Sequence, residues 1–176
     1  ETVFVVLDWK NAFNCVHRSR VVHVIRSTPS VRVWLRAYNS HTAPMSPIYY
    51  RGDKGLVKND YASVTGGQQG DLMGSDGYCL ATLEDNRWLD AELGKHGGSY
   101  RAGVDDGVLH GPAEVVWDLV ERYIARVELS CGLSVNRSKS KCWSPNGHYG
   151  ARPADFPIGE LTPVSYTHLR AHETKC

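Results

Sequence analysis

Val3-Phe4-Val5-Val6-Leu7-Asp8 is an uninterrupted apolar run that ends in a carboxylate. A continuous β-branched run of this kind is typical of a strand that is covered on both faces. Much further along the chain, Asp105-Asp106-Gly107 lies between short apolar segments at Val104 and at Val108-Leu109, which indicates a hairpin. A strand end that meets a hairpin tip would bring three carboxylates together.

Three converging acids suit a nucleotidyl-transfer site. Such a site needs two divalent cations about 3.5 to 4 Å apart to clamp the attacking and leaving oxygens, and hard cations prefer carboxylate ligands. Two adjacent like charges also need a cation to neutralise them if they are partly buried. The alternative is that Asp105-Asp106-Gly107 is an ordinary turn and Asp8 a strand-end cap.

Composition limits the function classes. The chain has 176 residues, of which 41% are hydrophobic, so it can bury one moderate core. Its net charge of +1 excludes a strong overall basic field and leaves only local patches for binding nucleic acid. Five scattered cysteines without CxxC spacing argue against a zinc ribbon or a disulfide framework, and favour an intracellular setting. No apolar run is long enough to span a bilayer.

Hydrophobic periodicity predicts an α+β fold, a small antiparallel sheet packed on helices. The predicted elements are a strand at 3–7, short helices at 21–26 and 31–38, a hairpin at 48–57, a helix at 72–93, the acid-bearing hairpin, a helix at 112–130 and a short final strand. The helix at 112–130 is the clearest, because Pro112 stands in its first turn and Gly132 follows its end.

Four short patterns occur along the chain in a fixed order: Asp8-x-x-x-x-Phe13, Gly66-x-x-Gln69-Gly70, Asp105-Asp106 and Gly132-Leu133-x-x-Asn136-x-x-Lys139. They resemble motifs A, B, C and D of reverse transcriptases, and are most similar to non-LTR (LINE-type) retrotransposon polymerases. Each alone is a weak signal, but their joint order over residues 2–143 is strong. The resemblance implies a polymerase palm that joins deoxynucleotides to a primer 3′-hydroxyl, with an RNA template, a DNA primer and dNTP as partners and no membrane.

The resemblance also implies a metal site. Asp8, Asp105, Asp106 and the backbone carbonyl of Trp9 would hold two Mg²⁺ ions, with Mn²⁺ as a substitute. Lys139 corresponds to the lysine that protonates departing pyrophosphate, a general-acid role. It is equally consistent with an ordinary surface lysine.

Substrate contacts are implied at two further places. Phe13 matches the ring that lies beneath the sugar and excludes a 2′-hydroxyl, although a core Phe would look the same. Gln69 and Gly70 would approach the template base and the incoming nucleotide, where a missing Cβ allows close backbone contact. Arginines in the first two helices could contact template phosphates, although a solvated helix face explains at least half of them. They are Arg18, Arg20, Arg26, Arg32 and Arg36.

Two positions depart from the family pattern. Gly103 stands where an aromatic residue usually precedes the acid pair, and Leu72 stands where proline usually follows Gly-Asp. A glycine there would weaken the strand that aims the acids. Three interpretations therefore stay open: a retroelement polymerase, a silent RNA-binding module or decayed copy, and a group II intron-type enzyme.

The ends of the chain set the expected domain boundaries. We expect residues 1–143 to form a palm from which fingers and thumb are missing, so that the chain alone would be inactive, and residues 144–163 to be loosely structured. Residues 164–174 resemble one reading frame of a sequencing-library adapter, so we exclude 164–176 from the fold. The expected location is intracellular, and nuclear if the host is a eukaryote; the oligomeric state is left open.

Overall fold

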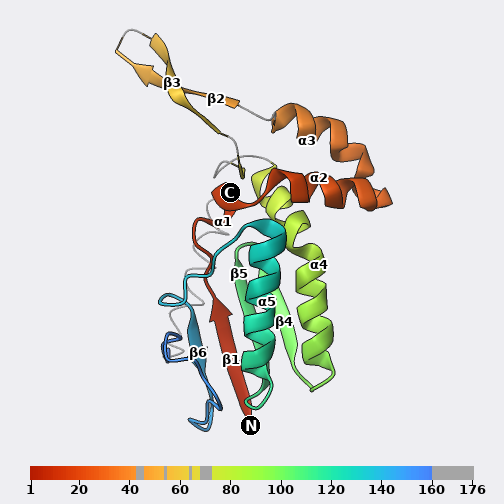
Figure 1. The fold of residues 1–176 in the computed structure, drawn as a ribbon, viewed down its shortest axis with the longest axis vertical. Coiled ribbons are helices and arrows are strands. Elements are labelled where there is room, and N and C mark those ends of the chain that lie inside the picture. The colour runs from red at the N-terminus through yellow and green to blue at the C-terminus, as the bar shows by residue number, and fades with distance from the viewer. Residues whose placement is uncertain (43–45, 54, 64, 68–72, 160–176) are drawn as a thin grey trace, which may run out of the picture.

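The computed structural model describes residues 1–42, 46–53, 55–63, 65–67 and 73–159 (Figure 1). The strands are β1 (Thr2–Leu7), β2 (Ser46–Gly52), β3 (Gly55–Ser63), β4 (Ser99–Gly103), β5 (Asp106–Pro112) and β6 (Lys141–Trp143). The helices are α1 (Ala12–Cys15), α2 (Arg18–Ser27), the 3₁₀ helix η1 (Pro29–Trp34), α3 (Leu35–His41), α4 (Gly74–Gly94) and α5 (Val116–Cys131).

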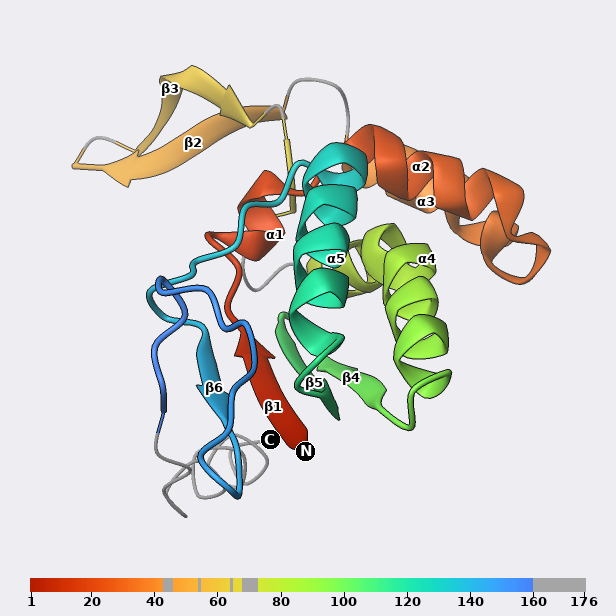
Figure 2. The same cartoon turned by 60° about the horizontal axis from the view of Figure 1, so that its bottom comes forward.

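The main sheet has the strand order β4-β5-β1-β6, and each neighbouring pair is antiparallel. Helices α4 and α5 pack together over one face of this sheet (Figures 1 and 2). The prediction of an α+β fold with a small antiparallel sheet on helices is therefore confirmed.

The two faces of β1 are buried to different degrees. Val3, Val5 and Leu7 are 0% exposed and belong to the core, whereas Phe4 and Val6 are partly exposed. The expectation that β1 is covered on both faces is therefore wrong, because the helices pack against its odd-numbered side chains only. This alternation decides which side chains reach each side of the sheet.

Helix α5 supplies much of the core through one stripe of side chains. Its members are Val116, Leu119, Val120, Tyr123, Ile124 and Val127, as the periodicity predicts, and all are buried. Gly132 ends the helix with φ of 72°, the left-handed conformation that glycine adopts without a Cβ penalty. The start differs from the prediction, since Pro112 pairs with Thr2 at the end of the β1–β5 ladder and the helix begins at Val116.

Two other regions differ from, or agree with, the expected elements. The predicted helix at 31–38 is divided between two elements: the 3₁₀ helix η1, which begins at Pro29, and the α-helix α3, which follows it. The hairpin predicted at 48–57 is confirmed as β2 and β3, which form a separate two-stranded sheet that projects from the body (Figure 1).

The segment 144–159 has no long helix or strand, but several contacts anchor it. Phe156 is fully buried and packs on Trp117 with ring centroids 5.4 Å apart. The Trp117 indole donates to the carbonyl of Tyr149 at 2.6 Å, and the Gly159 N–H donates to Cys142 at 2.9 Å. Residues 160–176 lie outside the described residues, and no described helix is long and apolar enough to cross a membrane.

Candidate active site

The structure places the three predicted acids at the same end of the main sheet. Asp8 directly follows β1, whose last residue Leu7 pairs with Gly107 on β5. Asp106 begins β5 and pairs with Gly103 on β4, so Asp105 lies in the two-residue turn between these strands. A strand end and a hairpin tip meet here, as the sequence predicts.

The acids are near enough to influence one another electrostatically. Desolvation raises the pKa of the Asp106 carboxyl, and the negative charges of Asp105 and Asp8 raise it further. The charge of Asp105 also contributes to the raised pKa values of Tyr78 and Cys79, after the larger effect of burial. The charge of Asp105 is therefore felt at the first turns of α4.

The donor chemistry fits a hard cation, because carboxylate oxygens are the ligands that Mg²⁺ prefers. Within the described residues, however, no group of three or more His, Cys, Asp or Glu side chains is assembled closely enough to hold a metal ion. The ligand set Asp8, Asp105 and Asp106 therefore stays a prediction, and binding would require these carboxylates to draw together.

Trp9, the other predicted ligand, is held by a bridge to the segment after α5. The Lys10 N–H donates to Ser134 at 2.9 Å, and the Asn136 N–H donates to the Asp8 carbonyl at 2.7 Å. The Trp9 ring is buried and packs edge-on against Tyr123 at 5.9 Å. This bridge uses the carbonyl of Asp8 and not that of Trp9.

Ser140 positions Asp8 and was not anticipated from the sequence. Its hydroxyl is fully buried, accepts the Asp8 N–H at 3.1 Å and donates to the Asn136 carbonyl at 3.0 Å. The predicted Asn136-x-x-Lys139 pattern points to this segment, but it does not identify the serine. Lys139 itself is exposed, and its N–H donates to Asn136 at 3.0 Å, so the structure leaves its proposed acid role as a prediction.

The predicted glycine-rich segment docks on the turn that follows Asp8. Gly66 and Gly67 donate their N–H groups to the carbonyls of Val16 and Phe13, at 2.9 and 2.7 Å. A Cβ on Gly66 would lie 2.3 Å from the backbone of Asn14, so only glycine fits. Gln69 and Gly70, which are predicted to approach the template base and the nucleotide, lie outside the described residues, so that prediction stays a prediction.

Phe13 lies in α1 beside this docked segment. It is partly buried against the core, and its ring centroid is 5.5 Å from that of Tyr78 on α4. Both interpretations of Phe13, as a core ring and as a sugar-facing ring, are consistent with this half-buried position.

The turn that carries Asp105 is strained. Val104 has φ of 59°, in the left-handed region that favours glycine and is unusual for a β-branched residue. Its side chain is 42% exposed, so packing does not explain the conformation. Backbone strain of this kind is often found at functional sites.

The arginines near the N-terminus of α2 are turned toward the protein. The Arg18 side chain donates to the Gly66 carbonyl at 2.8 Å. Arg20 pairs with Glu84 at 2.6 Å and lies 3.9 Å from the buried Asp85. These two side chains therefore hold α2 against its neighbours, which is a structural role.

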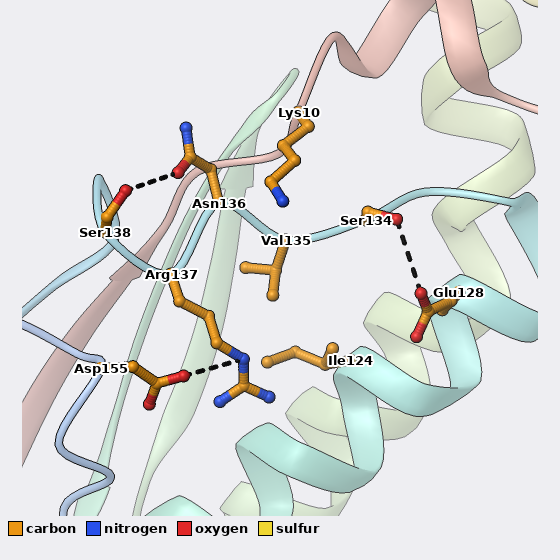
Figure 3. A pocket seen from close by; sticks show the side chains of 9 residues that line it. All are labelled: Lys10, Ile124, Glu128, Ser134, Val135, Asn136, Arg137, Ser138 and Asp155. Atoms are coloured by element: carbon orange, nitrogen blue, oxygen red, sulfur yellow. Dashed lines mark hydrogen bonds and ion pairs between the residues drawn. The ribbon is translucent and has the colours of Figure 1, made fainter.

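A separate pocket of about 560 Å³ lies between α5 and the segment after it (Figure 3). Lys10 points into it, while Arg137 is held by Glu121 at 2.5 Å and Asp155 at 3.5 Å. The full lining is Lys10, Ile124, Glu128, Ser134, Val135, Asn136, Arg137, Ser138 and Asp155. None of the three predicted acids lines this pocket, so it is distinct from the candidate active site.

No protein-family model and no curated protein sequence matches the chain. Solved structures do. Telomerase from Candida albicans, in complex with a TWJ fragment of telomeric RNA, matches with a TM-score of 0.62 and 13% identity over 82% of this chain and 28% of its own. Apo telomerase from Candida tropicalis, truncated from its C-terminal domain, matches with a TM-score of 0.60 and 13% identity over 86% of this chain and 32% of its own.

A further Candida tropicalis apo telomerase gives a TM-score of 0.61 at 11% identity and covers 84% of this chain. The chain spans about a third or less of the length of these neighbours. The likeness shows that the chain has the fold of a reverse-transcriptase-like polymerase.

Proposed function

We propose that this chain is the palm segment of an RNA-directed DNA polymerase from a non-LTR retroelement, acting in the nucleus of a eukaryotic host. One observation carries the proposal: Asp8, Asp105 and Asp106 come to the same sheet end within a reverse-transcriptase-like fold. The RNA held by one of the neighbouring telomerases supports an RNA template as partner.

In this proposal the three carboxylates and the Trp9 carbonyl would hold two Mg²⁺ ions, which would neutralise the negative charge that develops during the transfer. A primer 3′-hydroxyl gives up its proton to solvent water and attacks the α-phosphate of a deoxynucleoside triphosphate, so that a new O–P bond forms while the bond between the α-phosphate and pyrophosphate breaks. Ser140 keeps the backbone of Asp8 in place, and Lys139 donates a proton to the pyrophosphate. Phe13 rejects a 2′-hydroxyl, and Gln69 and Gly70 contact the template base and the nucleotide.

A silent polymerase-like RNA-binding module is the second candidate function. One observation favours it: the described acids do not form a closed metal group. Three converging carboxylates repel one another when no cation is bound. A module without catalysis gains nothing from this repulsion, so the convergence of the acids counts against the second candidate.

A metal titration separates the two candidates. Because a ligand bound by the native state raises the melting temperature, Mn²⁺ and Mg²⁺ should stabilise the wild-type chain. Asp105→Asn should abolish this effect, and Mn²⁺ electron paramagnetic resonance should show the loss of bound ion directly. Asp53→Asn, an exposed acid in the turn between β2 and β3, is the matched control and should behave as wild type. Equal metal responses in all three proteins would reject the metal site.

Primer extension on an RNA template then tests polymerisation. We expect no synthesis by the chain alone and synthesis when it is joined to segments that complete a polymerase, because positioning can contribute about 7 to 11 kcal/mol to such reactions. DNA synthesis by the chain alone would refute the prediction that polymerisation requires these further segments. Metal binding without synthesis in the longer protein would favour the silent module.

A further inference from the structure

The helix that carries Phe13 is too short to be stable by itself. Helix α1 has four residues, and its N-cap residue Asn11 makes no capping hydrogen bond with its side chain. A single helical turn is unstable in water, because its formation fixes several residues in return for very few hydrogen bonds. The last carbonyls of such a turn also lack partners within the helix. The conformation of α1, and with it the position of Phe13, therefore depends on contacts with other parts of the chain.

These contacts come from a segment about 50 positions further along, which is called the capping segment here: Thr65, Gly66 and Gly67. Its two glycine N–H groups donate to the carbonyls of Val16 and Phe13, at 2.9 and 2.7 Å. The hydroxyl of Thr65 lies 3.4 Å from the Cys15 carbonyl and 3.3 Å from the Val16 carbonyl. The capping segment thus satisfies the carbonyls at the end of α1, a task that a helix's own C-terminal residues usually perform.

The capping segment is wedged between α1 and α4. A Cβ on Gly66 would lie 2.3 Å from the backbone of α1, and a Cβ on Gly67 would lie 3.0 Å from the Cα atom of Gly74, the first residue of α4. Further along α4, Tyr78 contacts the Phe13 ring with ring centroids 5.5 Å apart. The Phe13 backbone is therefore held by the capping segment, and its ring rests on the helix that this segment touches.

Arg18 fixes the capping segment in addition to holding α2. As the first residue of α2, it donates its Nε–H to the Gly66 carbonyl at 2.8 Å. Both polar backbone groups of Gly66 are thus bonded to the short stretch from Val16 to Arg18. A hydrogen bond with a charged donor is about twice as strong as a neutral one. Gly66 is also buried, which limits the access of water that could replace the guanidinium.

We propose that Arg18 is a positioning residue for nucleotide selection, because it fixes the Phe13 ring through the capping segment. The proposal rests on the proposed function, from which it takes the role of Phe13 in rejecting a 2′-hydroxyl. Arg18 contacts no substrate in this proposal. A ring that excludes one oxygen atom by steric conflict has to be held to within about 0.5 Å. Loosening the capping segment should therefore admit ribonucleotides, since it weakens a repulsive contact.

Fluorine NMR of the chain itself tests the positioning. The chain has three phenylalanines, so incorporation of 4-fluorophenylalanine gives a signal from Phe13 and two internal references, Phe4 and Phe156. Arg18→Met removes the guanidinium but keeps an unbranched apolar side chain. It should shift or broaden the Phe13 signal and leave the two references unchanged. A Phe13 signal identical to that of the wild type would overturn the proposal.

Amide hydrogen exchange tests the contact with the capping segment. Because a charged hydrogen bond is lost, the two glycine N–H groups should exchange about tenfold faster in Arg18→Met. Arg18→Lys keeps a charged donor and should restore most of the protection. Arg87→Met removes an exposed arginine from α4 and is the control that should behave as wild type. Thr65→Val, which removes the capping hydroxyl, is a second variant and should affect the same N–H groups. Unchanged exchange in Arg18→Met would also overturn the proposal.

Nucleotide selection is measured in the completed polymerase. The ratio of kcat/KM for a dNTP to kcat/KM for the matching rNTP should fall about fivefold in Arg18→Met and recover in Arg18→Lys. Mn²⁺ binding by the Arg18→Met chain, measured by electron paramagnetic resonance, should equal that of the wild type, since the proposal places Arg18 outside the metal site. A general loss of folding would instead lower both quantities.

The proposal and the proposed function can fail separately. If the Phe13 signal moves in Arg18→Met but the completed wild-type polymerase makes no DNA, the positioning of Phe13 by Arg18 stands and the catalytic proposal fails. If the completed polymerase makes DNA and Arg18→Met discriminates between dNTP and rNTP as well as the wild type does, the catalytic proposal stands and the selection role of Arg18 fails.

Discussion

The two faces of the main sheet divide the tasks of the molecule between them. Toward α4 and α5, β1 presents Val3, Val5 and Leu7, all fully buried. On the other side it presents Phe4 and Val6, which are partly exposed, and then Asp8. A single alternating strand thus places the side chains that stabilise the fold on one face and the carboxylate proposed to bind metal on the other. The comparison implies that stability and function can be altered independently.

The largest expected effect comes from truncating the helix-facing side. Leu7→Ala should lower the free energy of unfolding by about 2 to 5 kcal/mol, because it removes buried methyl groups and leaves a cavity. Val6→Ala on the other face should cost less than about 1 kcal/mol, since Val6 is only partly buried. Urea unfolding of both variants measures the difference. Similar losses in the two variants would show that the second face is also covered in solution.

Two glycines in the acid-bearing hairpin, Gly107 and Gly103, extend the comparison between the two faces of the main sheet. A Cβ on Gly107 would lie 2.6 Å from the hydroxyl of Tyr100, which is buried and 3.1 Å from the hydroxyl of Tyr123. Gly107→Ala should therefore cost about 1 to 3 kcal/mol through overpacking. Gly103→Ala is the control, because a Cβ there meets nothing within 4 Å.

The clash at Gly107 can be tested by a second change. In a Tyr100→Phe background the hydroxyl is absent, so Gly107→Ala should cost less than it does in the wild type. Additive losses in the double variant would instead locate the cost in the ring carbons of residue 100, which lie 3.0 and 3.2 Å from the added Cβ.

Val104→Gly should have a smaller effect of the opposite sign. A glycine relieves the left-handed strain at φ of 59°, and the gain in unfolded-state entropy offsets part of this, so we expect a net stabilisation of about 1 kcal/mol. Thermal unfolding measures it. If the strain serves the site, metal affinity or activity should fall in the same variant, whereas an unchanged site would mark the strain as incidental.

Local patterns in the sequence predict much of the fold. The stripe of α5 and the run of β1 follow from side-chain periodicity, and a strand end next to a hairpin brings Asp8 toward Asp105 and Asp106. Pro112 was ambiguous, because proline is favoured both in a first helical turn and at a strand end. The sequence alone does not distinguish these two positions.

Other parts of the site depend on contacts between distant residues. Ser140 reaches Asp8 across 132 residues, and no local pattern distinguishes this serine from an ordinary turn residue. The one-sided burial of β1 likewise depends on where the helices pack, which an apolar run does not reveal. Gly66 could be predicted in part. A glycine pair indicates a close backbone approach, but it does not show which residues are approached.

The smallest expected effect concerns the charge of Asp106 in metal-free protein. Because its pKa is raised above the ordinary aspartate value of 3.8, the folded state favours the protonated carboxyl. Its contribution to stability is therefore full below pH 3.8 and is lost as the pH rises through the raised pKa.

Asp106→Asn removes this dependence. In EDTA at neutral pH the variant should be more stable than the wild type by about half a kcal/mol or less, because solvent screens these exposed carboxylates. Its advantage should shrink as the pH falls toward 3.8, since the wild-type carboxyl then becomes protonated as well. Urea unfolding at a series of pH values tests this, with Asp53→Asn as the control acid. An Asp106→Asn protein that is less stable than wild type at neutral pH in EDTA would show that the charges on this face of the sheet do not repel.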